Sequence, residues 1–214
     1  MATLEPYALP DLPRLGPSIR SLIQRGGLVA LPTETFYGLG VNPFDESALD
    51  RLLGVKGRTD GKPILVLIGE TAQLPLLTPN LSRIGRLLVE LFWPGALTIL
   101  FPAHPSLPSN LTAGTAVVGV RLSPCLPVTE LLKVTGPVTG TSANRSGAAP
   151  ARTAAQVQRE FGRDVDLILD AGETPGGLPS TVIDSREPVR LIREGAVPRQ
   201  KIQNVLQTHG ILLI

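Results

Sequence analysis

Aromatic and sulfur-containing residues are scarce in this chain of 214 residues. Only 4% of the residues are aromatic, and Cys125 is the single cysteine. A single cysteine excludes an intramolecular disulfide, and His104 and His209 lie too far apart in sequence to form a local metal-ligand motif. Because the sequence has no disulfide framework, we expect the chain to work in the reducing environment of the cytoplasm.

Long apolar runs and a strong net charge are also missing. No segment approaches the roughly 18 consecutive apolar residues of a membrane-spanning helix. The first residues, MATLEPYALPDLPRL, lack the apolar core of a signal peptide. The net charge of +2 is small for a protein dedicated to binding nucleic acid, and few aromatic side chains are available to stack on bases. We therefore expect a soluble protein with no membrane partner.

Aliphatic residues, glycine and proline are abundant instead. Hydrophobic residues make up 43% of the chain, enough for a full core, and 22 glycines with 21 prolines indicate many tight turns. Strands are expected at 28–31, 64–68, 96–101, 116–122, 137–141, 165–169, 180–184 and 189–193. Helices are expected at 17–25, 45–54, 80–91, 127–134, 153–161 and 198–207, with Asp45, Asn80 and Thr153 as N-caps. This alternation predicts an α/β fold in one domain, residues 1–214, with a twisted, mixed and partly parallel sheet flanked by helices.

The stretch 28–40, LVALPTETFYGLG, changes from a buried strand into a polar loop. Pro32 has no N–H group and ends strand pairing. Thr33, Glu34, Thr35 and Tyr37 then place three hydroxyls and a carboxylate within five positions, and two glycines follow. A loop of this kind can bind a small molecule, although an ordinary polar turn after a strand has the same composition.

Basic residues stand out at two places in the chain, as a cluster before one strand and as a single arginine within another. The segment KGRTDGKP, residues 56–63, holds Lys56, Arg58 and Lys62 directly before a strand. Such a segment is either a site for an anion or a solvated basic turn. Arg121 lies within the apolar strand 116–122, where a charge is rarely buried without a partner. We therefore expect an anion near Arg121.

A second strand, 137–141, also runs into a polar loop, TGTSANRSG, residues 139–147. Ser142 and Asn144 supply small donors and acceptors there, and the glycines allow close approach of a phosphate to backbone N–H groups. Neither GxGxxG nor GxxxxGK[ST] occurs in the chain, so the standard phosphate-binding fingerprints are absent. Two loops of this kind can meet in one cleft, although plain turn chemistry remains the alternative. Residues 104–110, rich in proline and serine, are expected to form an exposed loop.

Seven segments together resemble a known family. PTETFYGLG, KGRTDGKP, FWPGALTILF, VVGVRL, TSANRSG, STVID and LIREG occur in the order and spacing of the YrdC/Sua5/TsaC family, and the chain resembles its single-domain members. The resemblance implies a YrdC-like fold with a central cleft. It also implies an enzyme, a nucleotidyltransferase that joins L-threonine, bicarbonate and ATP into threonylcarbamoyl-AMP and releases pyrophosphate. This product leads to the N6-threonylcarbamoyl modification (t6A) of adenosine 37 in tRNA, through downstream t6A-transfer proteins.

The resemblance also implies roles for particular residues. Lys56, Arg58, Ser142 and Asn144 fall at catalytic positions. Thr35, Arg121, Ser142 and Ser180 fall where the family holds threonine, and Lys56, Arg58, Lys62, Asn144 and Arg193 fall where it holds the nucleotide. Mg²⁺ is expected to arrive with ATP, with no metal site of the protein's own.

Three positions depart from the family pattern. Thr59 stands where proline is common, Leu67 where histidine is often found near the amino acid, and Val117 where threonine can contact nucleotide. Two other functions compete with synthesis. One is a module that binds tRNA or double-stranded RNA through phosphate contacts. The other is the handling of carbamoyl-adenylate, as in hydrogenase maturation, although those proteins add acylphosphatase and zinc-finger domains that this sequence does not show.

Overall fold

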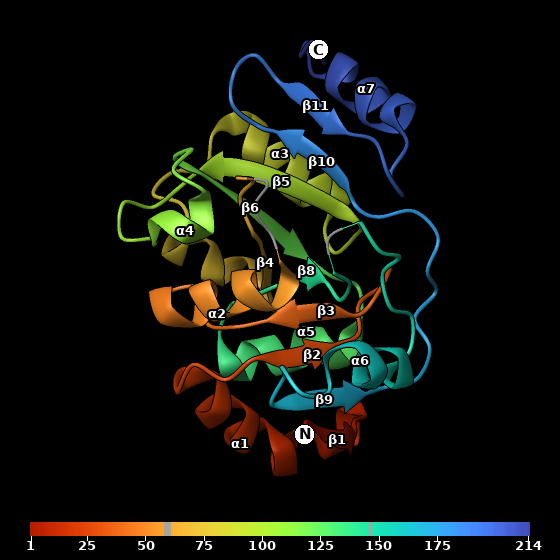
Figure 1. Ribbon diagram of the computed structural model, residues 1–214. Helices are drawn as coiled ribbons and strands as arrows, with labels where there is room; N and C mark the ends of the chain where they lie inside the picture. Colours follow the sequence, from red (N-terminus) through yellow and green to blue (C-terminus); the bar gives the residue numbers. More distant parts are fainter. Residues whose placement is uncertain (58–60, 146) are drawn as a thin grey trace.

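Two mixed β-sheets lie one above the other at the centre of the computed structural model, which describes residues 1–57, 61–145 and 147–214 (Figure 1). The strands are β1 (Thr3–Pro6), β2 (Val29–Leu31), β3 (Gly38–Gly40), β4 (Leu65–Ile68), β5 (Leu97–Pro102), β6 (Val117–Leu122), β7 (Val138–Thr139), β8 (Thr141–Ser142), β9 (Leu167–Asp170), β10 (Thr181–Asp184) and β11 (Arg190–Arg193). The five-stranded sheet has the order β1-β9-β2-β3-β8, and the six-stranded sheet has the order β11-β10-β5-β6-β4-β7. Both sheets contain parallel and antiparallel pairs. The predicted mixed α/β fold is therefore confirmed, with its strands divided between two sheets.

Helices pack around the two sheets (Figure 1). They are α1 (Leu12–Gln24), α2 (Glu46–Lys56), α3 (Arg83–Phe92), α4 (Ser109–Thr112), α5 (Leu126–Thr135), α6 (Ala154–Phe161) and α7 (Arg199–Thr208), together with the 3₁₀ segments η1 (Leu9–Asp11) and η2 (Thr71–Leu76). Apolar residues of α1 and α5 share one buried cluster with β2 and β9. A larger cluster contains residues of both sheets and joins the two halves of the molecule.

Side-chain caps fix where several helices begin. The carboxylate of Asp45 accepts a hydrogen bond from the backbone N–H of Ala48, and Thr153 accepts one from Gln156, so both predicted N-caps are confirmed. The prediction of Asn80 as the cap of α3 is wrong. Ser82 has this role, because its hydroxyl accepts from the N–H of Gly85 at 3.0 Å.

The predicted strand 137–141 is divided at Gly140, where the chain passes from one sheet to the other. β7 pairs with β4 in the six-stranded sheet, and β8 pairs with β3 in the five-stranded sheet. A Cβ at position 140 would lie 2.5 Å from Cγ of Leu67, so the close packing at this crossing requires glycine. The crossing brings the loop after β8 to the boundary between the sheets.

The predicted exposed loop at 104–110 is only partly correct. Leu107 is buried in the larger hydrophobic cluster, and α4 begins at Ser109. The backbone N–H of His104 donates to the carbonyl of Leu77, which ties the segment to the fold. An apolar residue and a backbone partner thus hold part of this segment against the core.

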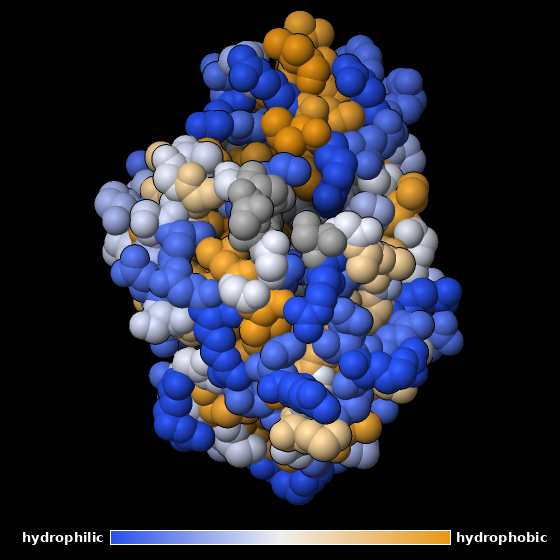
Figure 2. All heavy atoms as spheres, in the orientation of Figure 1, coloured by the Kyte–Doolittle hydropathy of each residue, from blue (hydrophilic) through white to orange (hydrophobic). Residues whose placement is uncertain are grey.

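Hydrophilic residues cover most of the face shown in Figure 2. Apolar surface gathers at its upper end, where the C-terminus lies in Figure 1. Near the C-terminus, Leu212 and Ile214 are exposed. Within the part of the chain that the structure describes, no helix has the length and apolar character needed to cross a bilayer.

Candidate active site

A cavity of about 650 Å³ is lined by residues of both sheets. Its volume lies within the roughly 300–1,000 Å³ that small-molecule sites usually occupy. The residues lining it are Thr35, Phe36, Tyr37, Gly38, Lys56, Lys62, Pro63, Leu65, Thr98, Leu100, Gly119, Arg121, Gly140, Thr141, Ser142, Asn144, Gly147, Pro179, Ser180, Val182, Ile192 and Arg193. The predicted meeting of two polar loops in one cleft is confirmed, because both contribute to this wall.

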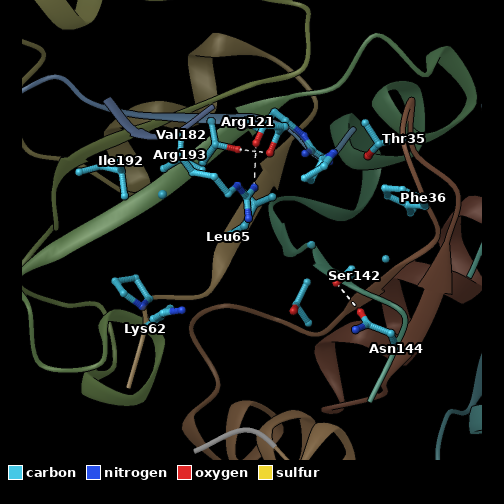
Figure 3. A pocket seen from close by; sticks show the side chains of 18 of the residues that line it. Thr35, Phe36, Lys62, Leu65, Arg121, Ser142, Asn144, Val182, Ile192 and Arg193 are labelled. Carbon is cyan, nitrogen blue, oxygen red and sulfur yellow. Dashed lines mark hydrogen bonds between the residues drawn. The ribbon is translucent and has the colours of Figure 1, made fainter. Parts of the chain in front are cut away.

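Eight of the nine predicted site residues line the cavity. They are Thr35, Lys56, Lys62, Arg121, Ser142, Asn144, Ser180 and Arg193. The ninth, Arg58, and the neighbouring departure Thr59 lie outside the described residues. Figure 3 shows Arg121 and Arg193 on the side that belongs to the six-stranded sheet, with Ser142 and Asn144 across the cavity from them. Residues that are distant in sequence thus converge on one space.

The first loop is shaped by its own hydroxyl groups. Thr33 donates to the carbonyl of Phe36 at 2.7 Å, and its oxygen accepts from the backbone N–H groups of Thr35 and Phe36. The hydroxyl of Thr35 lies 3.1 Å from that of Thr33, and both residues are buried. The carbonyl of Thr35 accepts from the N–H of Gly176, which holds the segment before β10 against the loop. The Thr35 side chain therefore has a fixed position at the cavity wall.

The second loop is held by Lys56 and by its own side chains. The Lys56 ammonium, on a residue that is only 6% exposed, donates to the carbonyls of Ser142 at 2.5 Å and Asn144 at 2.9 Å. The Ser142 hydroxyl donates to Oδ1 of Asn144 at 2.5 Å. The Asn144 amide then donates to the carbonyls of Arg145 and Ala148. A polar network thus sets the shape of this wall.

A buried ion pair joins the first loop to β6. The Nε atom of Arg121 lies 3.2 Å from Oε1 of Glu34, and the Arg121 residue is 4% exposed. The two atoms are within ion-pair distance, but neither has a hydrogen-bond partner among the residues that the structure describes, so the contact is electrostatic. Burial lowers the pKa of Arg121, the Glu34 carboxylate acts in the opposite direction, and Arg193 lowers it further. The anion expected near Arg121 is thus a side chain of the protein, and the sequence had not assigned Glu34 to the site.

The other oxygen of Glu34 is held by Ser123, the residue that follows β6. The Ser123 hydroxyl donates to Oε2 of Glu34 at 2.5 Å and accepts from the backbone N–H of Cys125. Ser123 and Thr129 are also linked, because the Thr129 hydroxyl donates to the Ser123 carbonyl. The Glu34 carboxylate is therefore anchored at the start of α5.

A pair of buried hydroxyls lies on the six-stranded side of the cavity. Thr98 Oγ1 and Ser180 Oγ are 2.9 Å apart, and both residues line the space. Arg193 donates from Nη2 to the Ser180 carbonyl at 2.8 Å. A Cβ on Gly195 would lie 2.1 Å from the Pro179 carbonyl oxygen, so glycine is needed for this close approach. Thr98 was not predicted as a site residue, although a hydroxyl within the apolar motif FWPGALTILF was the signal that could have found it.

The two other departures from the family pattern do not line the cavity. Leu67 is fully buried, pairs across the sheet with Arg121 and Val138, and packs against the backbone of Gly140. Val117 is buried at the start of β6, two residues before Gly119, which does line the cavity. Leu67 therefore supports the wall from behind.

Positive charge dominates the described lining. Lys56, Lys62, Arg121 and Arg193 are cationic, and no described lining residue is acidic. Among the described residues, no group of three histidine, cysteine, aspartate or glutamate side chains is placed to hold a metal ion. The described lining of the cavity is therefore suited to anionic molecules.

Comparison with known proteins places this chain in a family. The model of the Sua5_yciO_yrdC family, which carries the description Telomere recombination, matches residues 21–195. This chain belongs to the Sua5/YciO/YrdC family. Within it, the chain is 39% identical over 169 residues to the threonylcarbamoyl-AMP synthase of Thiobacillus denitrificans, with 78% of this chain and 89% of that protein covered.

Sua5/YciO/YrdC matches from Pyrococcus abyssi are longer than this chain. A threonylcarbamoyl-AMP synthase of Pyrococcus abyssi is 37% identical over 186 residues, which cover 86% of this chain and 55% of that protein. A crystal structure of P. abyssi Sua5 complexed with L-threonine matches with a TM-score of 0.87 at 32% identity, covering 100% of this chain and 62% of that chain. The chain thus spans less than two thirds of the Pyrococcus protein, and it shares the fold of the part it covers.

Proposed function

We propose that this chain is a threonylcarbamoyl-AMP synthase, a nucleotidyltransferase that converts L-threonine, bicarbonate and ATP into threonylcarbamoyl-AMP and pyrophosphate. The observation that carries the proposal is the cavity in which eight predicted site residues meet, four of them cationic. Relatives that bear this enzyme name share 37% and 39% of the aligned residues. The product would be passed to proteins that transfer it to adenosine 37 of tRNA.

The reaction brings two anions together. The amine of threonine and bicarbonate form a carbamate with loss of water. A carbamate oxygen then attacks the α-phosphorus of ATP, a new O–P bond forms, and the bond to the β-phosphate breaks as pyrophosphate leaves. Cations that face the cavity offset this repulsion and stabilise the charge that develops in the transition state. Positioning and electrostatics are sufficient, because no step needs a covalent bond to the protein.

We assign the residues to two ends of the cavity. Thr35, Arg121, Ser142 and Ser180 would hold threonine, with the Arg121 guanidinium facing its carboxylate. Lys56, Lys62, Asn144 and Arg193, together with Arg58, would hold the nucleotide. Ser142 and Asn144 would lie beside the reacting carbamate and α-phosphate. The hydrogen bonds of Lys56 to the second loop support a further role, since they shape the wall against which these atoms would react.

Magnesium would enter with the nucleotide. Mg²⁺ commonly keeps several waters and binds through substrate phosphates. This fits a cavity whose described lining has no carboxylate. When bound, the ion would neutralise phosphate charge, and the residues named above would still bind and orient both substrates.

Omission of single substrates tests the function. The wild-type chain, supplied with ATP, Mg²⁺, L-threonine and bicarbonate, should release pyrophosphate and form threonylcarbamoyl-AMP, detected by mass spectrometry. Omission of threonine, bicarbonate or ATP should abolish formation of the adenylate. Equal pyrophosphate release with and without threonine would overturn the proposal, because ATP would then be cleaved without the amino acid.

A further inference from the structure

Glu34 is the acidic partner of Arg121 among the residues that the structure describes. Its Oε1 atom lies 3.2 Å from Nε of Arg121, and its Oε2 atom accepts from Ser123. Glu34 itself does not line the cavity, whereas Arg121 does. The carboxylate thus acts on a ligand through Arg121, and its position behind the guanidinium is fixed by the hydroxyl of Ser123, which follows the strand of Arg121 directly.

The guanidinium of Arg193, assigned above to the nucleotide, also borders the end of the cavity that contains Arg121, because it bonds the Ser180 carbonyl. Arg193 lines the space and lowers the pKa of Arg121 through charge repulsion. It is oriented by its hydrogen bond to the Ser180 carbonyl at 2.8 Å. Two guanidinium groups and one carboxylate leave a single net positive charge here. Without Glu34, the same end would carry two positive charges.

The guanidinium of Arg121 keeps its donors for a ligand. Within the described parts of the chain, Arg121 makes no side-chain hydrogen bond, and its contact with Glu34 lacks hydrogen-bond geometry at Nε. Glu34 therefore supplies charge to Arg121 without occupying its terminal amino groups. Arginine presents these groups as a fork that fits either a carboxylate or a phosphate. Geometry alone does not choose between these two anions, but the local charge does.

We propose that Glu34 sets the charge specificity of this end of the cavity, so that it takes a singly charged carboxylate and rejects phosphate groups. The inference rests on the proposed function, because it concerns the end assigned to threonine. A phosphate carries close to two negative charges near neutral pH. The two positive charges of Arg121 and Arg193 would balance the charge of a phosphate. Because Glu34 cancels one of these positive charges, a phosphate brought here would carry excess negative charge. Charge differences of this kind have large effects in a buried site, where the effective dielectric constant is low. Glu34 thereby keeps the phosphates of ATP and the released pyrophosphate away from the amino-acid end.

The test replaces Glu34 by glutamine, which removes the charge and keeps the shape. Binding of inorganic phosphate is measured by calorimetry in the absence of nucleotide, and inhibition by phosphate is measured against threonine by mass spectrometry of the adenylate. We expect the affinity for phosphate to be at least about tenfold higher in Glu34→Gln than in wild type. This is the change expected when one repulsive charge is removed from a partly screened site. Phosphate should also become a competitive inhibitor with respect to threonine.

Two variants serve as controls. Glu70→Gln removes the same charge from an exposed glutamate outside the cavity and should leave phosphate binding unchanged. Glu34→Asp keeps the charge but moves it away from Arg121 by one methylene, so phosphate should bind more tightly than to wild type and less tightly than to Glu34→Gln. If Glu34→Gln does not fold, Glu34→Asp still decides the question.

The outcomes separate this inference from the proposed function. Equal phosphate affinity of wild type and Glu34→Gln, or of wild type and Glu34→Asp where the glutamine variant does not fold, overturns the role of Glu34. This holds even when the wild type makes threonylcarbamoyl-AMP. Failure of the wild type to make the adenylate overturns the proposed function, while the phosphate-binding comparison still reports on the charge at Arg121. Inhibition that is stronger in Glu34→Gln but competitive with ATP alone would place the new phosphate at the nucleotide end and would also overturn the inference.

Discussion

The ammonium group of Lys56 donates a hydrogen bond to the main-chain oxygen of Ser142 at 2.5 Å. Lys56 is the last residue of α2, and Ser142 lies 86 residues further along the chain. Lys56 also donates to the carbonyl of Asn144 at 2.9 Å. Because a buried ammonium requires polar partners, the two contacts fix the lysine and the loop together. Lys56 therefore contributes to the shape of the cavity as well as to its charge.

Replacement of Lys56 by methionine should lower both stability and activity. Methionine has a similar length but no donor, so the carbonyls of Ser142 and Asn144 would each lose a charged partner. Hydrogen bonds to charged groups contribute about 1.5–3 kcal/mol, and we expect a loss of unfolding free energy in that range. Urea unfolding and adenylate formation measure the two effects. Lys201→Met, at an exposed position of α7, is the control. Equal stability of the two variants would contradict the role of Lys56 in holding the loop.

Ser142 and Asn144 should act as one unit in catalysis. The Ser142 hydroxyl donates to the Asn144 side chain at 2.5 Å, so removal of either group disturbs the other. We expect the double alanine variant to lose less kcat/KM than the product of the two single losses. Asn144→Ala should cost more than Ser142→Ala, because the Asn144 amide also donates to the carbonyls of Arg145 and Ala148.

The control combines Ser142→Ala with Ser106→Ala, since Ser106 is an exposed residue outside the cavity. These two losses should combine additively. If Ser142 and Asn144 combine in the same additive way, their side chains act independently and the shared network has no catalytic role.

Stability should fall steeply in alkaline solution because of two tyrosines. Burial raises the pKa of Tyr7 and of Tyr37 from 10.0 to about 12. The negative charge of Asp11 also raises the pKa of Tyr7, and that of Asp170 also raises the pKa of Tyr37. The unfolded chain loses these protons near pH 10, while the folded chain keeps them until about pH 12. The stabilisation is therefore complete below pH 10 and is lost as the pH rises toward 12. Each tyrosine should contribute a slope of about 1.4 kcal/mol per pH unit.

Tyr37→Phe tests this titration. The variant loses the hydrogen bond from Tyr37 to the Gly172 carbonyl, so it should be less stable than wild type below pH 10. Its free energy of unfolding should nevertheless fall less steeply between pH 10 and 12, by about 1.4 kcal/mol per pH unit. Denaturant unfolding at several pH values measures both slopes. Parallel pH profiles for the two proteins would show that Tyr37 titrates alike in the folded and unfolded states.

Local features of the fold could be predicted because their causes lie close together in the sequence. Asp45 and Thr153 cap helices that begin at the next residue, and each bonds a backbone N–H three residues further on. The wrong choice of Asn80 over Ser82 shows the limit of this reasoning. Both residue types cap helices, and only the packed structure decides which one meets a free N–H group.

Contacts between distant residues could not be predicted in the same way. The sequence indicated that Arg121 needs an anion, but it did not identify Glu34 as that anion. Thr98 and Ser180 are 82 residues apart in the chain and share a hydrogen bond in the cavity. The division of the strand at Gly140 likewise depends on where Leu67 packs. The pairing of strands in the two sheets brings these residues together, and no local sequence pattern predicts that pairing.

The threonine end should distinguish related amino acids unequally. Serine lacks one methyl group, which is worth about 1–3 kcal/mol in an apolar pocket. Valine lacks the hydroxyl, so groups placed to bond it lose a partner, and that loss can reach several powers of ten. The buried hydroxyls of Thr35 and Ser180 are the candidates, since each has a protein partner and retains further capacity for hydrogen bonding. We therefore expect the order threonine, then serine, then valine in kcat/KM for adenylate formation.

Thr35→Val should reduce the difference in kcat/KM between threonine and valine as substrates. The variant removes a hydroxyl whose remaining hydrogen-bonding capacity threonine can use and valine cannot, and it keeps the volume of the side chain, so threonine loses more than valine does. The measurement is kcat/KM for each amino acid at saturating ATP and bicarbonate. Thr208→Val removes an exposed hydroxyl that donates to the Val205 carbonyl far from the cavity lining, and its selectivity should match that of wild type. If wild type uses valine as readily as serine, no hydroxyl of the cavity forms a selective hydrogen bond with the substrate side chain. If instead the gap is unchanged in Thr35→Val, recognition of that hydroxyl belongs to Ser180 and its partner Thr98.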